Sequence, residues 1–133
     1  MDEYNELRSS VGWFAINPEQ AEAGLMNSAY IVVSKDSKEA VGMSKLIWDG
    51  GSLAIIVDVI VRPTYQRMGI GTKMIEQLLE YLKGQMKLGW SIVVDLMSAS
   101  GKEEFYRKFG FRFRPREGRG AGMDMWILED KNL

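Results

Sequence analysis

The stretch Tyr65-Gln66-Arg67-Met68-Gly69-Ile70-Gly71-Thr72 decides the fold, because it joins two segments of different hydrophobic period. Before it, Leu53 to Val61 is apolar on both alternating faces apart from Asp58, which predicts a central β-strand covered on both sides. After it, apolar side chains recur at the 3.6-residue period of an amphipathic helix that is expected to end near Gly89. These side chains are Ile70, Met74, Ile75, Leu78, Leu79, Leu82 and Met86.

The two glycines of this strand-to-helix turn suit a phosphate. Gly69 and Gly71 let a ligand approach the main chain without meeting a side chain. The first turn of a helix adds unpaired N–H groups and partial positive charge, and Arg67 adds a full charge. The spacing fits neither the dinucleotide fingerprint nor the Walker turn. The alternative interpretation is a tight connection that binds nothing.

Working outward, the sequence predicts one α/β domain over residues 1–133, with a mixed sheet and helices on both of its faces. Upstream we expect helices at Asp2 to Arg8 and Pro18 to Met26, then strands at Tyr30 to Ser34 and Val41 to Trp48, which form an antiparallel meander with Leu53 to Val61. Downstream we expect a parallel strand at Trp90 to Met97, a helix at Lys102 to Phe109, and final strands at Phe111 to Arg114 and Met123 to Leu128.

The composition excludes several kinds of chemistry. The 133 residues contain no cysteine and no histidine, so thiolate or histidine metal sites, a Cys nucleophile and a Ser-His-Asp triad are ruled out, and no metal is expected. The net charge of −1 gives no general argument for nucleic acid as a partner. No apolar run reaches the roughly 18 residues that a membrane helix needs, so we expect no membrane partner and a cytoplasmic location.

Two motifs resemble those of the GNAT superfamily of N-acetyltransferases. Gln66-x-x-Gly69-x-Gly71 is similar to the family's Q/R-x-x-G-x-G/A turn, and Phe105-Tyr106-Arg107-Lys108-Phe109-Gly110-Phe111 is similar to its helix ending in L-Y-x-x-x-G-F. Both stand in the family's order, and the resemblance runs from about Tyr30 to the end. It implies a GNAT-type fold and acetyl-CoA as co-substrate, with the family's first strand absent from this sequence. That edge of the sheet is either one strand short or covered by a partner chain.

The resemblance also implies which residues bind the cofactor. The turn would hold the pyrophosphate of coenzyme A through Gln66, Arg67, Met68, Gly69, Ile70, Gly71 and Thr72. The backbone of Val59, Ile60 and Val61 would pair with the pantetheine arm and polarise the thioester carbonyl. Phe105 would pack on the pantetheine or in the core. Where the family often has Asn, this chain has Ala99, and the lost hydrogen bond is supplied by Ser98 or Ser100 or is not made.

Two catalytic residues follow from the same resemblance. Tyr106 matches the family tyrosine that protonates the departing thiolate, although a phenol is better suited to donate a hydrogen bond than to give up its proton. The alternative is a tyrosine with its hydroxyl at the surface. Asp58 is the sole charge of its strand and matches an acidic residue near the acceptor amine, acting directly or through water as the base. The alternative is a structural carboxylate.

The acceptor side is less defined. Trp13 and Phe14 match the loop that walls the acceptor pocket in the family, where they would favour a cationic or aromatic amine, or they form a hydrophobic plug. The arginines between Arg112 and Arg119 are a solvated loop or touch the 3′-phosphate of CoA or an acidic substrate.

We therefore expect an N-acetyltransferase that modifies a primary amine of a small molecule or peptide by direct attack in a ternary complex, and a homodimer by resemblance. The alternative is an inactive acetyl-CoA sensor or interaction module. Nucleic-acid binding rests on the arginine-rich loop alone, and we do not expect it.

Overall fold

The computed structural model describes residues 2–129. Its contacts divide the chain into two compact units, the first ending at Leu96 and the second starting at Met97. Most of the regular secondary structure belongs to the first unit.

The first unit contains a four-stranded mixed sheet. Two helices, α1 (Asp2–Ser10) and α2 (Pro18–Met26), precede the strands β1 (Tyr30–Asp36), β2 (Glu39–Trp48) and β3 (Leu53–Val61). A short 3₁₀ turn, η1 (Pro63–Tyr65), then leads to α3 (Ile70–Gln85) and β4 (Val93–Leu96). The strand order is β1-β2-β3-β4, antiparallel except for the parallel pair β3–β4. This confirms the predicted meander and the strand-helix-strand crossover.

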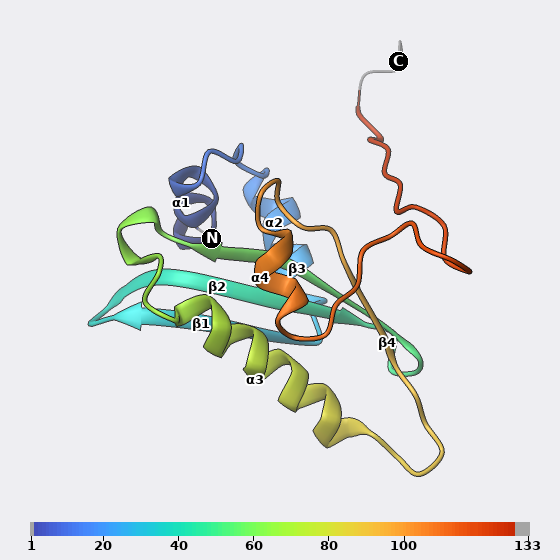
Figure 1. Ribbon diagram of the computed structural model, residues 1–133. Helices are drawn as coiled ribbons and strands as arrows, with labels where there is room; N and C mark the ends of the chain where they lie inside the picture. Colours follow the sequence, from blue (N-terminus) through green and yellow to red (C-terminus); the bar gives the residue numbers. More distant parts are fainter. Residues whose placement is uncertain (1, 130–133) are drawn as a thin grey trace. The chain divides into compact units, whose positions relative to one another are not determined.

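Helices cover both faces of this sheet, as the sequence predicted. Helix α3 lies on one face, and α1 and α2 lie on the other (Figure 1). The stripe of α3 buries Met74, Ile75, Leu78 and Leu82. On the opposite face a cluster of buried side chains joins α1 and α2 to the sheet. It consists of Tyr4, Leu7, Ala21, Ala40, Met43 and Ile60.

A β-bulge interrupts the pairing of β2 with β3. Met43 pairs with Ile60 and Lys45 pairs with Val57, so Ser44 alone stands opposite two residues of β3. One of these two, Asp58, has a left-handed φ of 52°. Asp adopts this conformation more readily than most residues other than glycine, because its short polar side chain can form local hydrogen bonds.

The parallel ladder between β3 and β4 is short. It runs from Leu53 opposite Val93 to Ile56 opposite Leu96. Within the first unit, the remainder of β3 from Val57 to Val61 is paired with β2 only. The second half of β3 therefore has one unpaired backbone edge within this unit.

The second unit has less regular structure than the sequence predicted. It contains the helix α4 (Glu103–Arg107) and an isolated bridge between Arg116 and Arg119. The predicted strands at 111–114 and 123–128 are wrong, since the described residues show no ladder at either place. The first segment runs directly into Pro115, which cannot donate to a ladder. The side chains of Met123, Met125 and Ile127 are 80% or more exposed, so β-forming composition alone did not supply a pairing partner.

Candidate functional site

The glycine turn ends in an uncapped helix N-terminus. Gln66 is extended, Arg67 has a left-handed φ of 66°, and Gly69 occupies the N-cap position of α3 with a φ of 84°. The first intrahelical bond runs from the Lys73 amide to the Gly69 carbonyl, at 3.2 Å. The N-cap side chain of α3 makes no capping bond, because a glycine has none to offer. The N–H groups that precede Lys73 are thus available to an anion.

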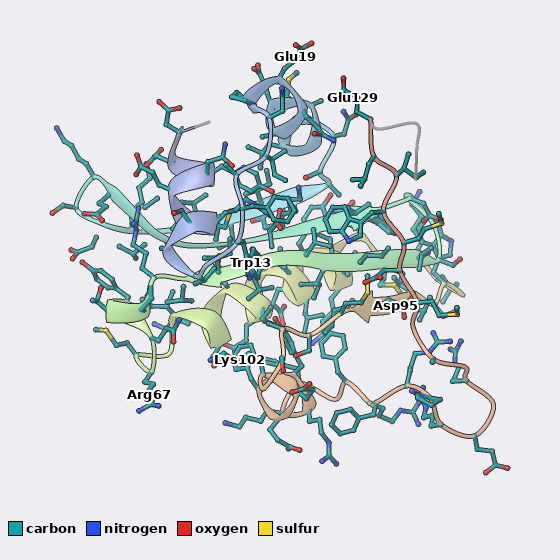
Figure 2. All side chains as sticks on the ribbon, turned by 90° about the horizontal axis from the view of Figure 1, so that it is seen from above. Trp13, Glu19, Arg67, Asp95, Lys102 and Glu129 are labelled. Carbon is teal, nitrogen blue, oxygen red and sulfur yellow. The ribbon has the colours of Figure 1, made fainter. Side chains whose placement is uncertain are left out.

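The surroundings of this turn leave room for a ligand. A Cβ at Gly69 would meet no atom within 4 Å. Figure 2 shows the Arg67 side chain directed outward from the turn. The Gln66 side-chain amide donates to the Val61 carbonyl at 2.9 Å, which ties the turn to the end of β3. Met68 is exposed, as are Gly69 and Thr72, while Ile70 and Gly71 are half-buried. The predicted phosphate-binding residues therefore lie together on one surface turn.

The predicted pantetheine strand is the part of β3 with the unpaired edge. The Ile60 side chain is buried in the core cluster, and Val59 and Val61 are half-buried. The side chains of this stretch thus pack, whereas one side of its backbone has no partner in the first unit. The side chains of this strand can therefore pack in the core while its backbone binds a ligand.

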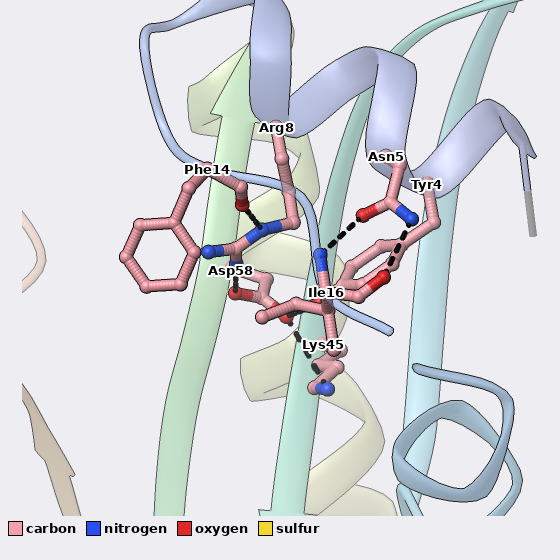
Figure 3. A network of polar contacts seen from close by, with 7 residues as sticks. All are labelled: Tyr4, Asn5, Arg8, Phe14, Ile16, Lys45 and Asp58. Atoms are coloured by element: carbon pink, nitrogen blue, oxygen red, sulfur yellow. Dashed lines mark hydrogen bonds and ion pairs between the residues drawn. The ribbon is translucent and has the colours of Figure 1, made fainter. Parts of the chain in front are cut away.

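Asp58 is the centre of a polar cluster on the α1 face of the sheet (Figure 3). The Tyr4 hydroxyl donates to Asp58 Oδ2 at 2.6 Å, and Lys45 Nζ lies 3.2 Å from the same oxygen. Arg8 Nη1 lies 3.4 Å from Asp58 Oδ1. The Asp58 side chain is 14% exposed and those of Arg8 and Lys45 are 11% exposed. Burial, together with the bond to Asp58, raises the pKa of Tyr4 to about 12, so the phenol stays neutral.

The loop between α1 and α2 is fastened to Arg8. Arg8 Nε donates to the Phe14 carbonyl at 2.9 Å, and the guanidinium lies 5.4 Å from the ring centre of Trp13 and 5.6 Å from that of Phe14. Asn5 and the backbone of Ile16 exchange two hydrogen bonds of 2.9 Å, visible in Figure 3. The cation over the predicted acceptor aromatics is thus a residue of the chain itself.

Sequence reasoning missed Tyr4, Arg8 and Lys45. The sequence did contain a signal for Lys45, because it is the sole charge within Val41 to Trp48. A cation in a buried strand needs a carboxylate such as Asp58 as its partner. Tyr4 and Arg8 carried none, since an acidic and basic helix surface is typical of solvated residues. Only the packing of α1 on the sheet brings them to Asp58.

Tyr106 lies in α4, in the second unit. Burial raises its pKa to about 12, and its ring makes edge contacts with Phe105 and Phe111. The Tyr106 hydroxyl makes no hydrogen bond to another described residue. Ser98 donates to the neighbouring Ala99 carbonyl at 2.8 Å, and this contact leaves the hydroxyl oxygen free to accept.

The described residues offer no resident metal site and no membrane helix. Among residues 2–129, no group of three or more acidic side chains is arranged to hold a metal ion. In the same range, every helix is too short or too polar to span a bilayer.

The chain is similar to known proteins in both sequence and structure. The family model described as "Acetyltransferase (GNAT) domain" matches residues 27–113. An uncharacterized N-acetyltransferase, ycf52, of Pyropia yezoensis is 31% identical over 113 residues, or 82% of this chain and 63% of its own length. Histone acetyltransferase TAP1 of Glycine max is 33% identical over 126 residues, 86% of this chain and 52% of its own. The chain therefore spans less than two thirds of these relatives.

Among solved structures, the chain is similar to SA2161 of meticillin-resistant Staphylococcus aureus, a protein of unknown function described as a probable acetyltransferase. The TM-score is 0.81 with 30% identity, covering 93% of this chain and 92% of the other.

Proposed function

Because this chain belongs to the GNAT family of acetyltransferases, we propose that it moves the acetyl group of acetyl-CoA to a primary amine of a small molecule or peptide. The observation that carries the proposal is the uncapped N-terminus of α3 beside the unpaired edge of β3. A phosphate group fits the first feature and an extended amide-containing chain fits the second.

In this proposal the turn from Gln66 to Thr72 binds the pyrophosphate, and Arg67 adds charge to the site. The backbone from Val59 to Val61 pairs with the pantetheine arm and donates a hydrogen bond to the thioester carbonyl. Ser98 and Phe105 are assigned to the cofactor by the family resemblance. Bound acetyl-CoA supplies an activated acyl group and a thiolate leaving group.

The acceptor amine attacks the acyl carbon directly, the C–N bond forms and the C–S bond breaks. The proton that the amine loses passes to Asp58, directly or through water. We assign to Tyr106 a hydrogen bond to the departing thiolate. A phenol with a pKa of about 12 keeps its proton beside a thiolate of pKa about 8.5, so Tyr106 stabilises the thiolate and solvent completes its protonation.

Calorimetric titration with acetyl-CoA tests the proposal. Gly71→Trp places a large side chain at the predicted pyrophosphate turn, and Gly84→Trp is the matched control, because a Cβ at Gly84 in the same helix meets nothing within 4 Å. We expect binding by the wild type, by Tyr106→Phe and by Gly84→Trp, and none by Gly71→Trp. Absence of binding by the wild type at millimolar acetyl-CoA would overturn the proposal.

An acceptor screen then separates an enzyme from a sensor. We expect Tyr106→Phe to lower kcat by about tenfold or more while acetyl-CoA affinity stays unchanged. Binding of acetyl-CoA without turnover of any amine would favour the inactive sensor instead.

A further inference from the structure

We propose that the acceptor is an α-amino acid or a similar small zwitterion, whose ammonium group is bound by Asp58 and whose carboxylate is bound by Arg8. This inference rests on the proposed function, because it takes the cluster around Asp58 as the acceptor side of the site. It narrows the acceptor from primary amines in general to amines that carry a neighbouring carboxylate.

The first argument is an excess of buried positive charge. Arg8 and Lys45 are two cations, and the carboxylate of Asp58 is their one ion-pair partner in the part of the chain that the structure describes. Tyr4 contributes no charge, since its phenol is neutral. All three charged side chains are at most 14% exposed, so water compensates the extra cation poorly. A carboxylate group of a ligand would pair with the extra cation.

The second argument is the fixed orientation of Arg8. Its Nε is bound to the Phe14 carbonyl and its Nη1 lies beside Asp58, while the rings of Tyr4, Trp13 and Phe14 each lie within 6 Å of the guanidinium carbon. The guanidinium is planar, so these contacts set the direction of Nη2. Within residues 2–129, the ion pair and the geometric hydrogen bonds of Arg8 run from Nε and Nη1 and none runs from Nη2, although the Tyr4 hydroxyl lies close enough to interact with the guanidinium. Nη2 is a preoriented donor for a carboxylate.

The third argument concerns the aromatic loop. Trp13 and Phe14 would attract a cationic acceptor if their faces were free, but Arg8 already lies over both. A polycationic acceptor, such as a basic peptide, would bring further positive charge to a site that has an excess of it. Such acceptors are therefore disfavoured, and a zwitterion is matched at both ends.

The test compares each proteinogenic L-amino acid with its carboxamide, which keeps the amine and removes the carboxylate. We expect at least one free acid to be acetylated with a kcat/KM about tenfold or more above that of its amide. In Arg8→Gln the ratio of kcat/KM for the acid to kcat/KM for the amide should fall to near one, because the KM of the acid rises. In Arg8→Lys the ratio should lie between the values of Arg8→Gln and the wild type. Lys83→Gln is the control and should leave the ratio unchanged, because Lys83 is 71% exposed on α3.

A second measurement does not depend on turnover. Thermal unfolding in saturating CoA should show stabilisation by the preferred acid, none by its amide, and none in Arg8→Gln. If Arg8→Gln fails to fold, Arg8→Lys carries the comparison.

An absence of any acid-over-amide preference, or better turnover of basic peptides, would overturn the inference. In that case an intact calorimetric response to acetyl-CoA would leave the proposed function standing. Loss of that response would instead remove the proposed function itself.

Discussion

At the scale of single residues, Asp58 combines a left-handed backbone conformation with three side-chain partners. Its left-handed φ lies at the bulge, and Tyr4, Arg8 and Lys45 hold its carboxylate. Its charge was evident in the sequence as the exception in an apolar strand, so a special role could be predicted. Its partners could not, because two of them come from a helix 50 or more residues away along the chain.

Replacing Asp58 with Asn separates its two possible roles. Asn adopts the left-handed conformation readily, so the bulge is kept while the negative charge is removed. If Asp58 takes the amine proton, kcat/KM near pH 7 should fall on the order of a hundredfold, and the loss should shrink at higher pH as the free amine deprotonates.

The pH profile of kcat/KM measures this effect. Asp36→Asn is its control, because Asp36 is an exposed carboxylate that also accepts from a tyrosine, at 2.6 Å. A loss that is equal at all pH values would identify Asp58 as a structural carboxylate.

Ser44 offers a stabilising substitution. It is fully buried, and its hydroxyl has no hydrogen-bond partner among the described residues. Ser44→Ala should raise the free energy of unfolding by about 1 kcal/mol, because an unpaired buried hydroxyl is removed and the packing is kept. Urea unfolding measures the change. Ser10→Ala is the comparison and should not stabilise, since the Ser10 hydroxyl donates to the Leu7 carbonyl at 2.6 Å.

Tyr4 makes the stability of the folded chain depend on pH in the alkaline range. Its pKa is about 12 in the folded chain, above the ordinary value of 10, so the folded state keeps a proton that the unfolded state loses. The contribution of Tyr4 is therefore complete below pH 10 and declines between pH 10 and about 12. Tyr4→Phe should be less stable than the wild type at pH 8, and the gap should narrow above pH 10. A gap that widens with pH would contradict the assignment.

At the scale of elements, the hydrophobic period and the turn residues predicted most helices and strands of the first unit well. The bounds of α2 and β3 match the predictions, and the Asn17 side chain caps α2 by accepting from the amides of Glu19 and Gln20. Helix α3 ends at Gln85, before the expected end near Gly89, and β4 occupies only part of Trp90 to Met97. The ends of strands are harder to predict, because a strand stops where the neighbouring strand diverges from it. That point depends on both strands and not on the sequence of one.

The contact between β2 and α3 depends on a glycine. A Cβ at Gly42 would lie 3.0 Å from the Ile60 carbonyl oxygen and 3.4 Å from the end of Met74. Gly42→Ala should therefore lower the free energy of unfolding by roughly 1–3 kcal/mol through overpacking. Gly84→Ala should have the opposite sign, a gain of about 0.5–1 kcal/mol, because its Cβ is unobstructed and Ala favours a helix. Thermal or urea unfolding of the two variants gives the comparison.

At the scale of the whole molecule, composition constrains the reaction. A chain of 133 residues without cysteine has no thiol to accept an acetyl group. Incubation with acetyl-CoA and no acceptor should leave the intact mass of the protein unchanged, and two-substrate kinetics should give intersecting lines. A stoichiometric acetyl adduct that an amine discharges would contradict direct transfer. The predicted homodimer is a separate question that sedimentation answers.

Because the β3–β4 ladder ends early, hydrogen exchange at the unpaired edge of β3 can report whether a ligand is bound there. Backbone amides between Val57 and Val61 that face away from β2 have no partner strand in the first unit, so their hydrogens should exchange quickly with heavy water. A pantetheine chain laid along this edge would slow that exchange, whereas an anion held only at the helix terminus would leave it fast. Peptide-resolved deuterium uptake can thus distinguish acetyl-CoA from its phosphate-bearing fragments without any chemical step.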